Sequence, residues 1–545
     1  MVEPGLDGVR AALARHEWQA AYDAAREVPE LGGAAGAERA DLLAEAAWWL
    51  GRLDECIAAR ELAYRGYDDL GDHRRAGQCA VWLWEHHAIG ARPAMAAAWL
   101  RRARRALAAD TQCEAHGAML LREAETAHGA GDLARATALA EEVVALGRHL
   151  RSVDLEAEAL QTLGRVVIDT GDVDGGMRHL DDAMLLAVEG RLGPYSTGKV
   201  YCSLISACEE LGDLDRAAEW TEATMRWADR HPFAIFPGIC RVHRAVILKR
   251  RGDLAGAERE AARACDELQG SHIGNTAAAY AEVGDIRRRL GDLDAAEAAF
   301  ARAEELVGSP CGALALLRLA QGRVDEAVAV VTGCLREATS NRLGRSVLLP
   351  IAVHVSIAAG DHDGAAAGLA ELEAIAGVFD TPVLAATLLS TRGRLALDRG
   401  DGTAVATLRA AADAWDALEV PYEVATARTL LGQALREEGD DPGAAASFAV
   451  AVRLFDQIGA RLDARLAAAD PPAPARPRPA GLTEREVEVL GLIAAGLSNN
   501  DIAASLHLSA KTVSRHLSNI FTKIDVSSRA AATAFAFRHD LAQPG

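Results

Sequence analysis

The sequence predicts an all-α protein: a long array of helical pairs, a proline-rich linker and a small four-helix domain. Glycine recurs about every 40 residues through most of the 545-residue chain, and a different pattern of helix caps and apolar spacings runs from Leu482 to the end. Between the two patterns, residues 470–481 hold five of the seventeen prolines, a density that a packed helix does not tolerate. We therefore expect domains at 1–469 and 482–545, joined by a linker over 470–481.

The repeat is centred on a glycine between two helices of similar length. Successive glycines lie about 40 residues apart, except for one shorter step between Gly291 and Gly322. Aspartate follows the glycine in eight of the eleven copies. Glycine can end a helix in the left-handed conformation, and aspartate can cap the next helix. The glycines are Gly51, Gly90, Gly131, Gly171, Gly212, Gly252, Gly291, Gly322, Gly360, Gly400 and Gly439.

A small residue usually stands five positions after this glycine, where a short side chain lets neighbouring helices approach closely. Examples are Ala136, Ala217, Ala257, Ala296, Ala327, Ala365 and Ala444. Segments such as "GDLDAAEAAFARAEEL" resemble tetratricopeptide (TPR) repeats, although the step is longer than the ~34 residues usual for that repeat. HEAT-type helical pairs have a similar period but lack the G-D-x-x-x-A signature. The resemblance implies an α-solenoid whose groove binds a ligand, peptide or protein.

Charge is distributed unevenly along the chain. The formal net charge is −20, but from Arg476 onward there are eight basic and six acidic residues, leaving 50 basic and 72 acidic residues before it. The acidic excess therefore lies in the solenoid, and the terminal domain is mildly basic. At cellular salt the solenoid's charge is largely screened beyond ~10 Å.

Several other functions lack the residues they require. "GPYSTGKV" at 193–200 fits G-x-x-x-x-G-K, but Val200 replaces the Ser/Thr of a nucleotide loop and no strand precedes it. Neither Cys113-x-x-His116 nor the pair His86–His87 has the further ligands of a closed zinc site. We expect no enzyme activity, no cofactor and no metal. The nine scattered cysteines and the absence of a signal peptide or membrane-spanning segment favour a reducing, cytoplasmic location.

Helix caps place four helices in the terminal domain. Thr483-x-x-Glu486 predicts a capping box for the first, and Ser498-x-x-Asp501 predicts one for the second. Ser509 is expected to cap a third helix, "AKTVSRHLSNIFTKI", and "SSRAAATAFAFRHDL" makes a fourth. In the third helix the spacing of apolar residues predicts one buried stripe: Val513, Leu517, Ile520 and Ile524.

The opposite face of the third helix can donate hydrogen bonds and carries no acid. It presents Lys511, Ser514, Arg515, Ser518, Asn519 and Thr522. Two helices joined by a short turn, with such an outer face on the second, are typical of a helix-turn-helix that enters the major groove. We place this motif at about residues 498–517.

The segments Leu482–Leu490, Gly496–Ala503, Leu506–His516 and Lys523–Arg529 resemble the signature of LuxR-type (GerE-like) DNA-binding domains. The resemblance implies that Ser514, Arg515 and Ser518 read bases. It implies contacts to phosphate or sugar from a further set: Asn499, Asn500, Lys511, Thr512, His516 and Lys523. The family often has lysine where Asn500 and Ser514 stand here, so a weaker electrostatic grip is expected.

The same resemblance implies a buried ion pair between Glu486 and Arg529. Family members dimerise through the last helix, where Phe535 and Phe537 provide excess apolar surface. Packing inside the domain is the alternative role for these two rings.

We therefore expect a transcription regulator that binds double-stranded DNA as a homodimer, with an effector in the solenoid. The alternative is a TPR scaffold whose terminal domain contacts only proteins.

Overall fold

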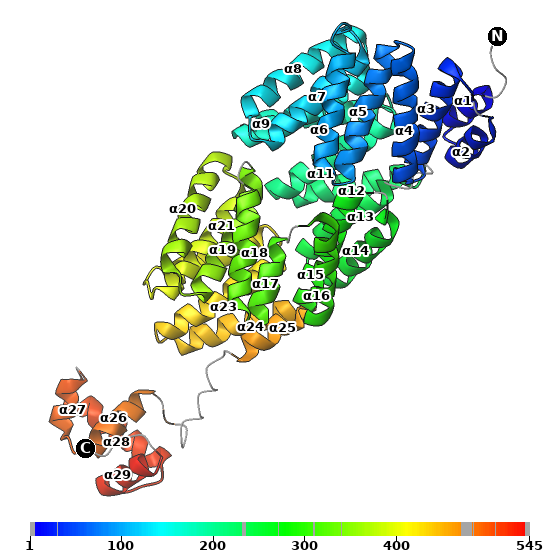
Figure 1. Ribbon diagram of the computed structural model, residues 1–545. Coiled ribbons are helices and arrows are strands. Elements are labelled where there is room, and N and C mark those ends of the chain that lie inside the picture. The colour runs from blue at the N-terminus through cyan, green and yellow to red at the C-terminus, as the bar shows by residue number, and fades with distance from the viewer. Residues whose placement is uncertain are drawn as a thin grey trace. The chain divides into compact units, whose positions relative to one another are not determined.

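The computed structural model describes residues 6–29, 31–230, 236–270, 272–308, 311–338, 341–469, 482, 484–506 and 508–539. Within these ranges all regular secondary structure is helical (Figure 1). The chain divides into two compact units, Met1–Asp470 and Pro471–Gly545. The predicted all-α fold is confirmed. Thr483 and the proline-rich segment 470–481 lie outside the described residues.

The first unit begins with six helical pairs. They are α1 (Leu6–Ala14), α2 (Trp18–Glu27), α3 (Gly33–Trp49), α4 (Leu53–Asp69), α5 (His73–Ile89), α6 (Pro93–Ala106), α7 (Glu114–Gly129), α8 (Leu133–Leu150), α9 (Val153–Thr170), α10 (Val173–Val188), α11 (Pro194–Leu211) and α12 (Leu214–Ala228).

The second half of this unit continues the same pattern and ends on a single helix. It contains α13 (Phe236–Arg250), α14 (Leu254–Leu268), α15 (Ile273–Leu290), α16 (Leu293–Val307), α17 (Gly312–Ala320), α18 (Val324–Glu337), α19 (Arg342–Ala358), α20 (His362–Phe379), α21 (Pro382–Asp398), α22 (Ala404–Ala417), α23 (Pro421–Glu437), α24 (Asp441–Ile458) and α25 (Arg461–Ala469).

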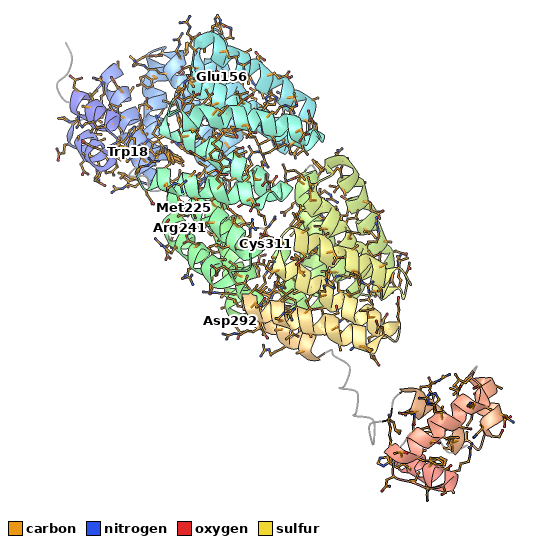
Figure 2. The ribbon with its side chains drawn as sticks, turned by 180° about the vertical axis from the view of Figure 1, so that it is seen from behind. Trp18, Glu156, Met225, Arg241, Asp292 and Cys311 are labelled. Carbon is orange, nitrogen blue, oxygen red and sulfur yellow. The ribbon has the colours of Figure 1, made fainter. Side chains whose placement is uncertain are left out.

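The recurring glycine joins the two helices of most pairs, and in seven of its eleven copies the aspartate that follows it caps the second helix. Gly291 has φ +90°, and the Asp292 carboxylate, labelled in Figure 2, accepts a hydrogen bond from the Ala295 N–H at 3.1 Å. The turn at Gly90 differs from the prediction. Gly90 has φ −77°, and Ala91 takes the left-handed conformation instead, with φ +53°. The turn therefore keeps its shape with the left-handed residue moved by one position.

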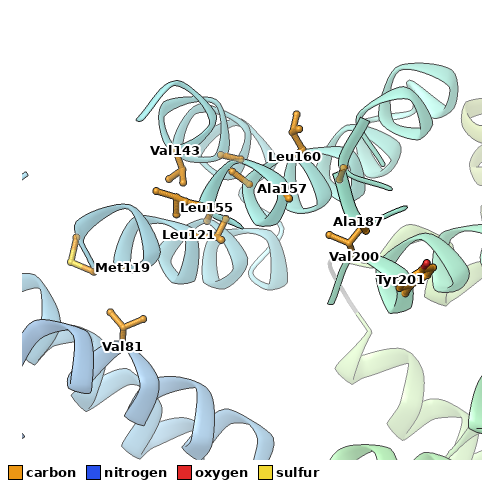
Figure 3. Close-up of a cluster of buried hydrophobic side chains, with 14 of the residues drawn as sticks. Val81, Met119, Leu121, Val143, Leu155, Ala157, Leu160, Ala187, Val200 and Tyr201 are labelled. Carbon is orange, nitrogen blue, oxygen red and sulfur yellow. The ribbon is translucent and has the colours of Figure 1, made fainter. Parts of the chain in front are cut away.

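The small residue of each repeat lies where neighbouring helices touch. All seven alanines predicted for this position are fully buried. Larger apolar side chains then fill the space between successive pairs, as Figure 3 shows for Met119 and Leu121 of α7, Val143 of α8 and Leu155 of α9. Nearest-neighbour packing of this kind is what holds a helical repeat array together.

The later helical pairs also pack against the glycine turns of the earlier ones. A Cβ atom added at Gly212 would lie 2.6 Å from Cβ of Val383, and one added at Gly252 would lie 2.7 Å from Cγ2 of Ile458. Arg251 in turn forms an ion pair with Glu419 on the facing segment. The solenoid thus winds back on itself. We call this contact between α9–α16 and α20–α25 the winding seam.

The first helices of successive pairs share a buried polar centre. The Tyr195 ring of α11 packs edge-on against Trp48 of α3 and Trp82 of α5. The Arg122 guanidinium of α7 lies 2.6 Å from a Glu85 carboxylate oxygen and 2.9 Å from one of Glu158. Between these helices the inner surface is therefore filled by side chains.

Candidate nucleic-acid interface

The second unit is a four-helix domain with a separate apolar core. Its helices are α26 (Glu484–Ala494), α27 (Asn499–Ser505), α28 (Ala510–Lys523) and α29 (Arg529–Arg538). The core includes Val489 and Leu490 of α26, Ile502 of α27 and Ala532 of α29. Val513 of α28 belongs to the same core, so α27 and α28 are held together as a fixed pair.

Side-chain caps fix where the paired helices begin. Ser498 and Asp501 form the predicted capping box, in which the Ser498 N–H donates to an Asp501 carboxylate oxygen at 3.1 Å. The hydrogen bonds from the Ser498 hydroxyl and N–H lower the pKa of Asp501 below its usual value. The Ser509 hydroxyl accepts a hydrogen bond from the Thr512 N–H at 3.1 Å, so Ser509 caps α28 as predicted.

The apolar stripe of α28 faces the core. Val513, Leu517, Ile520 and Ile524 are all buried, as their spacing predicts. Consequently the opposite face of α28 points to solvent, and all six of its predicted members are exposed: Lys511, Ser514, Arg515, Ser518, Asn519 and Thr522.

Arg515 is the cationic side chain nearest the middle of this face. Within the described part of the domain it makes no ion pair, so its guanidinium keeps all of its donors. The hydroxyl groups are arranged differently: Ser514 donates to the Ala510 carbonyl at 3.0 Å and Ser518 to the Ser514 carbonyl at 3.2 Å. Ser518 keeps both lone pairs available, and Ser514, which also accepts from the Asn499 amide, keeps one, so in this arrangement both serines can accept a hydrogen bond from a ligand.

The other predicted contact residues surround this face. Thr512 and His516 are half-buried at its edge, and Asn500 is exposed at the start of α27. The Asn499 amide donates to the Ser514 hydroxyl at 3.4 Å and its carbonyl oxygen accepts from Arg529 at 2.8 Å. Asn499 therefore links α27 to both α28 and α29.

The predicted ion pair between Glu486 and Arg529 is not the one the structure contains. Glu486 is only 4% exposed, and Lys523 is the cation beside it, with its Nζ 2.6 Å from Oε2. Arg529 instead donates to the Leu497 carbonyl and to Asn499. The end of α28 brings Lys523 over α26. The longer side chain of Arg529 instead reaches the turn before α27 and donates its hydrogen bonds there. The family resemblance indicated Arg529 as the partner of Glu486, and it assigned Lys523 to the DNA backbone.

The two phenylalanines of α29 lie in different surroundings. Phe535 is partly buried against the domain core and lies against His539, with ring centroids 4.3 Å apart and ring planes tilted by 39°. Phe537 is 40% exposed. Packing inside the domain therefore accounts for Phe535, while Phe537 offers an apolar ring to solvent.

The remaining sequence motifs belong to the solenoid. The nucleotide-loop pattern at 193–200 starts α11, and the Lys199 ammonium lies 3.2 Å from a Glu125 carboxylate oxygen. Among the described residues, no group of three or more His, Cys, Asp or Glu side chains could hold a metal ion. None of the described helices is long and apolar enough to cross a membrane.

Comparison with known sequences finds one family match in each of the two parts of the chain. The family described as "Bacterial regulatory proteins, luxR family" matches residues 480–536, and a tetratricopeptide repeat matches residues 277–306. The response regulator protein VraR of Staphylococcus aureus and that of Staphylococcus saprophyticus are each 52% identical over 62 residues. That match spans 11% of this chain and 30% of each relative.

Two solved structures align with much of this chain at low similarity. A structure of the Cut9–Hcn1 hetero-tetramer covers 84% of this chain and 95% of its own at 12% identity and a TM-score of 0.36. A human IFIT1 dimer with m7Gppp-AAAA covers 70% and 90% at 14% identity and a TM-score of 0.40. Taken together, the sequence matches and the helical architecture show that this chain carries a LuxR-family helix-turn-helix domain at residues 480–536, preceded by tetratricopeptide repeats.

Proposed function

We propose that the protein is a sequence-specific DNA-binding regulator of transcription, in which α28 enters the major groove. The main support is the exposed face of α28. It carries hydrogen-bond donors and acceptors and no acid, and the helix is fixed in place by a capped start and a buried stripe. Arg515 would read guanine, Ser514 and Ser518 would contact neighbouring bases, and Lys511, Thr512, His516 and Asn500 would bind the backbone.

Binding-site selection with the full chain tests this function. Random duplexes are enriched over several rounds, and the recovered sequences are expected to share a short palindrome, because a dimer presents two copies of α28. Enrichment of no common sequence would reject the regulator. It would favour the alternative of a scaffold whose terminal domain contacts only proteins.

The proposed roles follow the domain boundaries. Residues 1–469 sense an effector, residues 470–481 connect, and residues 482–545 bind DNA. A hollow of about 800 Å³ supports an effector site: it lies between the α15–α16 turn and helices α24 and α25, and α25 leads into the connecting segment. Its lining includes Leu290, Val452, Arg461 and Arg465.

Deleting residues 1–469 tests whether the solenoid regulates the terminal domain. If it does, the deletion changes DNA affinity, oligomeric state or transcriptional output. Equal values for the full chain and the fragment in all three measurements would remove the sensing role while leaving DNA recognition intact.

A further inference from the structure

Helix α6 carries a concentration of positive charge in an acidic part of the chain. Residues 86–109 contain five arginines and no carboxylate. Four of these arginines, Arg101, Arg102, Arg104 and Arg105, lie on the last two turns of α6. The chain before the terminal basic segment holds 72 acidic and 50 basic groups, so this cluster is opposite in sign to its surroundings.

The carboxylates around α6 do not neutralise this charge. Arg104 lies 2.6 Å from Glu123, but the same carboxylate also faces Arg135 at 3.5 Å. Arg101 and Arg105 are exposed, and neither forms an ion pair within the residues that the structure describes. The cluster therefore keeps several guanidinium groups free to bind an anion.

The shape of the surface suits a chain of phosphates. A hollow of about 450 Å³ on α6 is lined only by Ala98 and the four arginines. Arg102 lies over the Trp99 ring, with its Cζ 4.5 Å from the ring centroid, which orders its guanidinium. Arg101 and Arg105 are one helical turn apart, about 5–6 Å between Cβ atoms, so they can reach neighbouring phosphates of one strand.

We propose that this arginine surface of α6 binds the phosphate backbone of duplex DNA outside the sequence that α28 reads. The inference rests on the proposed DNA-binding function. Guanidinium groups match phosphate oxygens in bidentate geometry, and the hollow is lined by one alanine and four arginines, with no aromatic or large aliphatic side chain among them. A second contact on the same duplex raises affinity, because it forms at high effective concentration.

The test compares the wild-type chain with the double variant Arg101→Gln/Arg105→Gln on two duplexes. One duplex holds only the selected binding site, and the other extends it with unrelated sequence on both sides. The wild type is expected to gain affinity from the extension and the variant to gain less. On the long duplex, losing two phosphate contacts makes the plot of log affinity against log salt about 2 units shallower. A change from about 50 to about 200 mM salt then weakens the variant about tenfold less than the wild type.

Arg259→Gln/Arg263→Gln on α14 is the matched control. These arginines are also exposed and one turn apart, but glutamates surround them, and Arg263 lies 3.8 Å from Glu267. The control removes the same charge and is expected to behave as the wild type. If both double variants lose affinity equally, net charge is responsible and the α6 surface is not a contact.

Two further outcomes separate this inference from the proposed function. If the longer duplex raises the affinity of the α6 variant as much as that of the wild type, α6 does not contact DNA, while the proposal that α28 reads the sequence is unaffected. An unchanged DNA affinity with altered transcription would mean that α6 binds an acidic protein instead. If the wild-type chain binds neither duplex, both the regulator function and the α6 contact fall.

Discussion

Substitution of Arg515 can distinguish the reading of bases from general affinity for DNA. Its free guanidinium can bind O6 and N7 of guanine together, a contact that contributes about 1–3 kcal/mol of discrimination. We expect Arg515→Ala to relax the preference at one base pair of each half-site, as measured by binding-site selection. Lys511→Ala serves as the comparison, because loss of a backbone contact weakens all sequences alike. An unchanged base preference for Arg515→Ala would refute the assignment.

Lys523 has a structural role that its position in the family signature did not reveal. Lys523→Ala would remove the cation that lies beside the buried Glu486 carboxylate, and it is expected to destabilise the domain by about 1–3 kcal/mol. Thermal unfolding of residues 471–545, followed by circular dichroism, measures this loss. Lys511→Ala removes the same charge from an exposed position and is expected to change stability little. Equal unfolding temperatures for the two variants would contradict a structural Lys523.

At the scale of helices, a largely buried ion pair joins α11 to α13. His243 Nδ1 lies 3.0 Å from Glu209 Oε2. Burial disfavours the charged ring, but the Glu209 carboxylate and the Cys202 thiol outweigh it and raise the pKa of His243 from 6.5 to about 10. Because the folded pKa is the higher one, this pair stabilises the solenoid fully below pH 6.5, and the stabilisation falls as the pH rises to about 10.

The pH dependence of unfolding tests this pair. At neutral pH, His243→Gln is expected to lower the free energy of unfolding by about 1.5–3 kcal/mol. The gap between wild type and variant should shrink as the pH rises and close near pH 10. A gap that stays constant between pH 7 and pH 10 would show that the imidazole is neutral in the folded protein.

The sequence predicted the helices and their caps better than it predicted which side chains from different helices contact each other. The G-D pattern located the turns and, except at Asp401, the caps, because both depend on local backbone geometry, and the α28 stripe followed from spacing alone. The shift from Gly90 to Ala91 was not predictable, since both residues can close the same turn. The choice of Lys523 over Arg529 for Glu486 depends on how α26, α28 and α29 cross, which no local pattern encodes.

At the scale of the whole solenoid, the winding seam could not be predicted from the sequence, because it joins residues that lie far apart in the chain. Gly212 and Gly360 both have positive φ, so alanine at either position costs about 1–2 kcal/mol. At Gly212 the added methyl group also meets Val383, whereas at Gly360 nothing lies within 4 Å. We expect Gly212→Ala to be the more destabilising by about 1–3 kcal/mol in thermal unfolding. If the two variants lose the same amount of stability, Gly212 is not in tight contact with Val383 at the winding seam.

Most helical arrays tolerate the gain or loss of a unit, because each unit touches only its neighbours. In this protein Arg251 reaches Glu419 across 168 positions, and several turns depend on similarly distant partners. Excising a single helical pair between Arg251 and Glu419 would shift the two sides of the winding seam relative to each other, so that the distant partners no longer meet. The number of units is therefore fixed by geometry, and homologous recombination within the array should yield chains that fail to fold.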